Sequence, residues 1–317
     1  MRFYDLTVTD NGRIVKQWRS HPNGIYDPGA QNIEFDMIVT PSSTPSGGQI
    51  ITIEGVSLND LQQAQKYTGL TFVLSAGMAA GLPLANKSQQ GIISGGFIFQ
   101  SFGNWEGTEM TLTFFVYPSE YYFNNPANFT LNWIKNTPFS DALKQTIGGV
   151  YKKSKININI SGDLKLPYDC VGFYGTLDDL AQFVLQISTE MNHPVYIVPQ
   201  ANEINIFDDT YKPDPVPIAF TDLIGQPTWI SPNVMQVKTV LRADIISGSY
   251  INMPEKFQNI PGLISTRTDS MPSSMKYNSA FLGKFYVIEM RHIGNYRSPD
   301  GSGWATIMNC AVEGTQP

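Results

Sequence analysis

The side chains that most often carry out chemistry are few in this sequence, and their spacing matches no catalytic motif. The three histidines, His21, His193 and His292, lack the spacing of metal ligands, and no H-E-x-x-H segment occurs. No G-x-S-x-G segment is present to place a nucleophilic serine. The glycines of residues 91–96 come without the lysine of a phosphate-binding loop. We therefore predict no catalytic residue, no bound cofactor, no metal ion and no enzymatic activity.

Two groups of carboxylates admit a chemical and a structural interpretation. Asp178 and Asp179 could form an acid pair, or they could occupy the first turn of a helix and interact with its dipole. Asp208 and Asp209, with Asp214 nearby, could bind a cation, although their spacing is not that of a calcium loop. The structural interpretation is the better one for both groups. A glycosidase whose carboxylates come from distant strands would leave no local motif, so that alternative stays open.

Three aromatic residues lie at or near hairpin loops, namely Trp105, Tyr296 and Trp304. They could pack beneath their own loops. They could instead contact a neighbouring subunit, because aromatic residues are enriched in interface cores. We take these three residues as candidates for a subunit interface.

The loops that carry these residues belong to two similar hairpins. Residues 285–312 predict a strand, a turn-rich loop and a return strand, because apolar and polar residues alternate on both sides of the loop. Residues 97–116 have the same layout, with Gly103-Asn104-Trp105 in the place of Gly294-Asn295-Tyr296. The match is either chance or the trace of a duplicated β-domain.

Alternation and turn residues predict further elements along the chain. Asn11-Gly12 between residues 3–9 and 13–18 indicates a β-hairpin. Additional strands are predicted at residues 33–39, 49–54, 71–75, 92–99, 156–160, 195–198, 203–207, 228–230, 234–241 and 249–252. Helices are predicted after Ser57, Thr137 and Thr176, and residues 260–276 are predicted to form a long surface loop. In the first helix Leu58, Leu61 and Ala64 should face inward, and in the second Pro138 should occupy the first helical position.

Composition narrows the classes of partner. The chain of 317 residues has a formal net charge of −6, and we find no cluster of lysine and arginine that would hold nucleic acid tightly. The two cysteines, Cys170 and Cys310, are too few for a disulfide framework and are predicted to be free thiols. The N-terminus is charged and no apolar segment is long enough to span a bilayer, so we expect folding in a reducing cytoplasm and no membrane insertion.

The order of several phrases resembles the baseplate hub proteins of tailed phages, especially those with contractile tails. The first phrases are EGVS, GMAAGLPLA, QGIISGGFIF and MTLTFFVYP, which lie between residues 54 and 118. After a small α/β insert comes IGQPTWISPNVMQVKTVLRADIISGSYINMP, with a Leu-Arg-x-Asp-x-x-x-Gly turn. The resemblance extends over nearly the whole chain, but it depends on layout and short phrases and includes no catalytic residue.

The resemblance implies a mainly β fold with two similar antiparallel, tail-tube-like β-barrel domains on either side of an α+β domain. We place these domains at residues 1–122, 123–212 and 213–317. It also implies a homotrimer whose six barrels join the sixfold tail tube to the threefold spike and other baseplate proteins, with DNA only as passing cargo. Such a protein would assemble in the host cytoplasm and reside in the virion. The alternatives are a carbohydrate-binding or glycosidic tail-tip protein and the equivalent hub of a bacterial contractile injection system.

Overall fold

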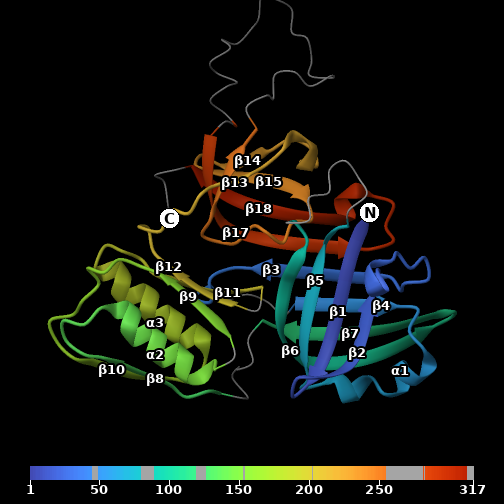
Figure 1. Cartoon of the computed structure of the whole chain (residues 1–317), viewed down its shortest axis with the longest axis horizontal. Coiled ribbons are helices and arrows are strands. Elements are labelled where there is room, and N and C mark those ends of the chain that lie inside the picture. Colours follow the sequence, from blue (N-terminus) through green and yellow to red (C-terminus); the bar gives the residue numbers. More distant parts are fainter. Residues whose placement is uncertain are drawn as a thin grey trace, which may run out of the picture.

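The chain is mainly β, with three α-helices among its described residues (Figure 1). The structure is a computed structural model, and it describes residues 1–44, 49–79, 89–118, 126–152, 154–201, 203–254, 281 and 283–312. The predicted loop at residues 260–276 lies outside these ranges. The mainly β class with a small α/β insert, predicted from the sequence, is confirmed.

The elements follow one another in three groups. The first group consists of β1 (Arg2–Asp10), β2 (Arg13–Arg19), β3 (Ile33–Val39), β4 (Gln49–Glu54), α1 (Leu58–Gln62), β5 (Thr71–Met78), β6 (Gly91–Glu106) and β7 (Glu109–Tyr117). The second consists of β8 (Phe129–Trp133), α2 (Phe139–Val150), β9 (Lys155–Asn159), β10 (Cys170–Tyr174), α3 (Leu177–Glu190), β11 (Tyr196–Gln200) and β12 (Glu203–Phe207). The third consists of β13 (Val216–Pro217), β14 (Thr228–Ser231), β15 (Val234–Val240), β16 (Tyr250–Met253), β17 (Gly283–Asn295) and β18 (Trp304–Val312).

Several of these elements follow directly from local chemistry. Asn11 and Gly12 have φ angles of 48° and 84°, which is the positive-φ turn that the Asn-Gly pair predicts between β1 and β2. The Ser57 side chain accepts a hydrogen bond from the Asp60 amide, and the Thr176 side chain accepts one from the Asp179 amide, so the caps of α1 and α3 are confirmed.

Other local predictions were wrong. Pro138 is the N-cap of α2 rather than its first residue, and the Thr137 hydroxyl donates back to the Ile134 carbonyl. Leu58 is 44% exposed instead of facing inward, because α1 is short and presents only part of its surface to the core.

One large sheet runs through the first and third groups. Its described strands follow the order β14-β15-β18-β17-β3-β4-β7-β6-β5-β1-β2, with β16 and β13 branching from β17. The path has two ends among the described residues, β14 and β2, so the hydrogen-bonded ladder does not close into a barrel. The sheet nevertheless coils strongly. This coiling brings Trp18 on β2 against Phe114 on β7, with ring centroids 5.9 Å apart.

The large sheet contains the same arrangement of strands twice. In the first β-unit, β3 to β7, the spatial order is β3-β4-β7-β6-β5. In the second β-unit, β14 to β18, it is β14-β15-β18-β17-β16. Every neighbouring pair within each unit is antiparallel. The sequence order of the strands and their spatial order therefore correspond one to one.

Backbone details occur at matching places in both β-units. The positive-φ glycines Gly69 (φ 84°) and Gly248 (φ 86°) each lie two residues before the third strand of their unit. The Gly69 amide donates to the Ile98 carbonyl, and the Gly248 amide donates to the Val287 carbonyl. A break in the strand ladder follows directly in each case, after Ile98 in β6 and after Val287 in β17. These coincidences extend the internal repeat from topology to single residues.

The repeat corrects the alignment made from the sequence. If Ile98 corresponds to Val287, then Trp105 corresponds to Gly294, because each lies seven residues further along its strand. The Gly-Asn-aromatic match placed Gly103 on Gly294 and was therefore wrong by two residues. Gly103-Asn104-Trp105 also lies within β6, whereas the turn follows at Gly107.

The second group of elements forms a layered α/β unit with its own core. Helices α2 and α3 lie between a two-stranded sheet, β10-β8, and a three-stranded sheet, β11-β12-β9 (Figure 1). Their buried side chains form one cluster with Trp133, whose ring stacks on Phe139 at 3.9 Å. The division at residues 122 and 212 stays a prediction, because Val198 and Phe207 pack into the core of the second β-unit.

Candidate assembly surface

One face of the large sheet carries polar and charged side chains from both β-units, interspersed with apolar ones such as Ile38 and Ile50. Residues that are paired across β15, β18, β17, β3, β4, β7 and β6 alternate between the core and this face. We call it the polar face. It carries the carboxylates of Glu34, Asp36, Glu54, Glu106, Glu109 and Glu289 and the cations of Lys238 and Arg291. Six carboxylates against two cations make this face acidic.

Side chains on the polar face are joined across strands. Arg291 on β17 forms a bidentate ion pair with Asp36 on β3, with its Nε 2.6 Å from Oδ1. Asn295 donates to Glu34. The pKa of Glu34 is raised, first by burial and then by the neighbouring Glu54 carboxylate, while the bond from Asn295 opposes the rise. The β17–β3 junction is thus held by side chains as well as by the ladder.

Two strand edges flank the polar face at opposite ends of the stack. At one end β14 has β15 as its described strand neighbour on one side only. At the other end, β5 pairs with β6 only up to Phe97. Beyond that point the Ser101 amide donates to the Thr68 hydroxyl, which also lies within hydrogen-bond distance of the Ser101 hydroxyl. The exposed apolar side chains here include Trp229 (37%), Ile230 (51%) and Trp105 (61%). Unpaired edges with exposed apolar groups are sites where another strand can add.

The three aromatic interface candidates have different environments. The Trp105 ring is exposed, and its indole N–H donates to the Gly107 carbonyl at 2.9 Å. Trp304 is 2% exposed and its indole N–H donates to the Gly77 carbonyl of β5, so it is buried against a distant strand. Tyr296 lies between Tyr4 and Trp304, with centroids 4.9 and 6.1 Å away. Of the three, Trp105 therefore has the surface for a partner, and the interface role stays a prediction.

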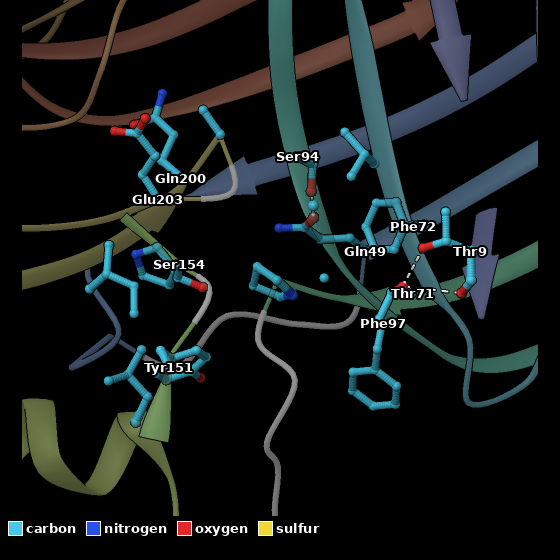
Figure 2. Close-up of a pocket in the computed structure, with 18 of the residues that line it drawn as sticks. Thr9, Gln49, Thr71, Phe72, Ser94, Phe97, Tyr151, Ser154, Gln200 and Glu203 are labelled. Carbon is cyan, nitrogen blue, oxygen red and sulfur yellow. Dashed lines mark hydrogen bonds between the residues drawn. The ribbon is translucent and has the colours of Figure 1, made fainter. Parts of the chain in front are cut away.

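A cavity of about 730 Å³ lies between the first β-unit and the α/β unit (Figure 2). On one side the Thr9 and Thr71 hydroxyls lie 2.6 Å apart, and Tyr151 and Ser154 lie on the other. The Glu203 carboxylate on its wall is already bound by Lys155 at 3.1 Å and Asn157 at 2.7 Å. The described lining residues include Lys152, Ser154 and Glu203 but neither histidine nor cysteine.

The carboxylate groups singled out from the sequence have structural roles. Asp178 and Asp179 lie in the first turn of α3, as the capping interpretation predicts. His193 and Asp209 form a pair with Nδ1 2.8 Å from Oδ1, and the bond to Asp209 raises the pKa of His193. Asp208 lies close enough to complete a set of three metal-type donors. Its oxygens already accept bonds from the Ser161 amide and from Thr210, which explains their orientation without an ion.

A buried polar cluster in the second β-unit was not predicted from the sequence. The Arg242 guanidinium, 4% exposed, contacts Asp222 at 3.0 Å and Asp244 at 2.6 Å. His292 is fully buried, with Nδ1 2.9 Å from the Thr306 hydroxyl, and burial lowers its pKa to about 4. The Leu-Arg-x-Asp phrase was the available signal for the Arg242–Asp244 pair. This cluster stabilises the loop between β15 and β16.

Comparison with solved structures identifies the fold. A tail protein from Neisseria meningitidis MC58 matches with a TM-score of 0.53 and 10% identity, covering 99% of this chain and 97% of that one. A 43 kDa tail protein of prophage MuSo2 from Shewanella oneidensis matches with a TM-score of 0.51 and 7% identity, covering 98% of each chain. The chain has the fold of these phage tail proteins. This confirms the mainly β, tail-protein fold that the resemblance implied, although the described strands of the large sheet form no closed β-barrel.

A further solved structure matches with a lower TM-score. An Escherichia coli component of the type VI secretion system matches with a TM-score of 0.48 and 9% identity, covering 89% of this chain and 73% of that one. No family model and no curated protein matches the sequence. Within the described ranges, none of the helices has the length and apolar character needed to cross a membrane.

Proposed function

We propose that this protein is a structural hub of a phage tail baseplate, in which three chains form a ring of six similar β-units. The observation that carries the proposal is the internal repeat, β3-β4-β7-β6-β5 and β14-β15-β18-β17-β16. A threefold ring can present an approximately sixfold surface only if each chain supplies two similar units. The repeat therefore suits a protein that joins a sixfold tail tube to a threefold spike.

The polar face suits the wall of a central channel in such a ring. Its six carboxylates outnumber its two cations. DNA phosphates bind where lysine and arginine displace counterions, and an acidic wall disfavours that exchange. DNA would pass along this face as cargo without being held. The protein would reside in the virion tail after assembly in the host cytoplasm, and its role would need no catalytic residue.

The proposal is tested on the purified full chain in two steps. Light scattering across a concentration series should show a homotrimer forming from monomers. An immobilised trimer should then retain the tail tube protein and the spike protein encoded beside it. As a matched control, the surface variant Val171→Ser, at a 62% exposed residue of β10 in the α/β unit, should behave like the parent. A protein that stays monomeric at every concentration and binds neither the tail tube protein nor the spike protein would contradict the proposal.

A further inference from the structure

A strand pairing between the two β-units already exists within one chain. Within one chain, the second half of β17 pairs with β3 and so joins the second unit to the first. Three successive pairs of that junction matter here: Arg291 opposite Ile38, His292 opposite Met37, and Ile293 opposite Asp36. The junction therefore joins the fourth strand of one unit to the first strand of the other.

The internal repeat assigns counterparts to the central residues of this junction. Counting from Ile98 and Val287, residues Phe102, Gly103 and Asn104 of β6 correspond to Arg291, His292 and Ile293 of β17. On the first strands, Thr228 and Trp229 pair with Gln236 and Met235, and Asp36 pairs with Ile50. Ile50 and Gln236 themselves correspond, since they lie opposite Phe115 and Asn309 in equivalent positions. Thr228 therefore corresponds to Asp36, and Trp229 to Met37.

These counterparts lie at the β14 and β6 edges described above. Within one chain these two edges cannot pair with each other. The stack β14-β15-β18-β17-β3-β4-β7-β6 places β14 and β6 at opposite ends. Only a second copy of the chain can bring a β14 edge against a β6 edge. The contact uses different surfaces on its two sides, so it propagates from copy to copy and closes into a ring when the rotation allows.

We propose that β14 of one chain adds to the free edge of β6 in the next chain, in the register of the β17–β3 junction. This inference rests on the proposed trimer and specifies its interface. Thr228 lies opposite Asn104 and Trp229 opposite Gly103, and continuing this register past the irregularity between Trp229 and Ser231 places Ile230 opposite Phe102.

The side chains at these positions complement one another. A Cβ at Gly103 would lie 2.7 Å from the Leu61 side chain, so Leu61 already covers Gly103 and offers an apolar side chain against which the Trp229 ring can pack. Phe102 packs on Phe115 at 5.8 Å and offers an apolar surface to Ile230. Burial of Trp229 and Ile230 by the added strand accounts for their exposure in the single chain.

Disulfide cross-linking tests the register directly. In a Cys170→Ser background, Asn104→Cys with Thr228→Cys should give covalent trimers under mild oxidation, because directly opposite residues lie within about 5.5 Å. Cys310 can stay, since it is buried and burial raises the pKa of its thiol. The matched control, Asn104→Cys with Gln226→Cys, shifts the register by two residues to about 7–8 Å and should not cross-link. A mixture of the two single variants, Asn104→Cys and Thr228→Cys, should stop at covalent dimers.

A charge swap provides an independent test. Phe102→Lys with Ile230→Lys places two cations opposite each other and should raise the concentration needed for trimer formation by about 100-fold or more. Phe102→Lys with Ile230→Glu should recover much of that loss. Ile14→Lys, at a 57% exposed residue of the β2 edge, is the control and should leave assembly unchanged.

The outcomes separate this inference from the proposed function. The β14–β6 register would be wrong if the trimer forms normally but neither cysteine pair cross-links, or if only the pair with residue 226 does. Either result would still be consistent with the proposed trimer. Equal assembly by the Lys–Lys and Lys–Glu variants would overturn the β14–β6 register as well. A chain that is monomeric at every concentration would contradict both.

Discussion

Replacing Gly248 by alanine is expected to destabilise the protein more than replacing Gly69, its counterpart in the first β-unit. Both glycines have positive φ and donate to the carbonyl just before a break in the strand ladder. They differ in the space around them. A Cβ at Gly69 would have no atom within 4 Å, whereas one at Gly248 would lie 2.2 Å from Cζ of Phe207.

The two costs can be separated. The positive φ costs an L-residue about 1–2 kcal/mol, and alanine recovers about 0.4–1 kcal/mol by restricting the unfolded chain. Gly69→Ala should therefore lower the free energy of unfolding by about 1 kcal/mol. At Gly248 the collision with the Phe207 ring adds about 1–3 kcal/mol of overpacking, for a total of about 2–4 kcal/mol.

Urea unfolding of both variants, followed by tryptophan fluorescence and compared at constant m-value, measures these costs. The double variant Gly248→Ala with Phe207→Leu completes a mutant cycle. A coupling energy of about 0.5–3 kcal/mol would assign the extra cost to the ring. Equal costs at the two glycines, or a stabilising Gly69→Ala, would show that the Phe207 ring and the positive φ do not set these costs.

The other predictions concern buried charge, pH and capping. Arg242→Met leaves the buried Asp222 carboxylate uncompensated and should cost about 3–5 kcal/mol in urea unfolding, whereas Arg291→Met, which removes an exposed pair, should cost about 1 kcal/mol or less. Between pH 6.5 and about 4 the unfolded chain binds a proton that buried His292 does not, so the free energy of unfolding should fall by up to about 1.4 kcal/mol per pH unit as the pH decreases. Unfolding curves for His292→Gln should lack this slope, and an unchanged slope would contradict the assignment. Thr176→Ala should cost about 1 kcal/mol and reduce hydrogen-exchange protection at the start of α3, while an unaltered helix end would refute its capping role.

Local chemistry predicted many elements because their signals act over few residues. The Asn11-Gly12 turn and the Thr176 cap depend only on neighbours in sequence. Strands β8 and β10 were missed because their pairing joins segments about 40 residues apart. Their alternation is also short, so a local window gives a weak signal.

The candidate assembly surface could be predicted only in part. The sequence suggested a repeat from a Gly-Asn-aromatic match, but the equivalent residues are Trp105 and Gly294. No sequence pattern identifies them as equivalent, because one is a large exposed ring and the other a glycine covered by Phe35. Correspondence between them lies in the ladder and its breaks, which are set by long-range pairing. Trp105 was chosen correctly as an exposed aromatic residue, whereas Trp304 is buried by contacts with distant segments.

The symmetry of the assembled protein can be measured by rotational averaging of electron-microscopy images of the purified assembly. The proposed ring should give end-on views with strict threefold symmetry, a strong sixfold component close to the axis, and an open centre. Rings without the sixfold component, twofold particles, or isolated chains at concentrations that favour assembly would contradict it.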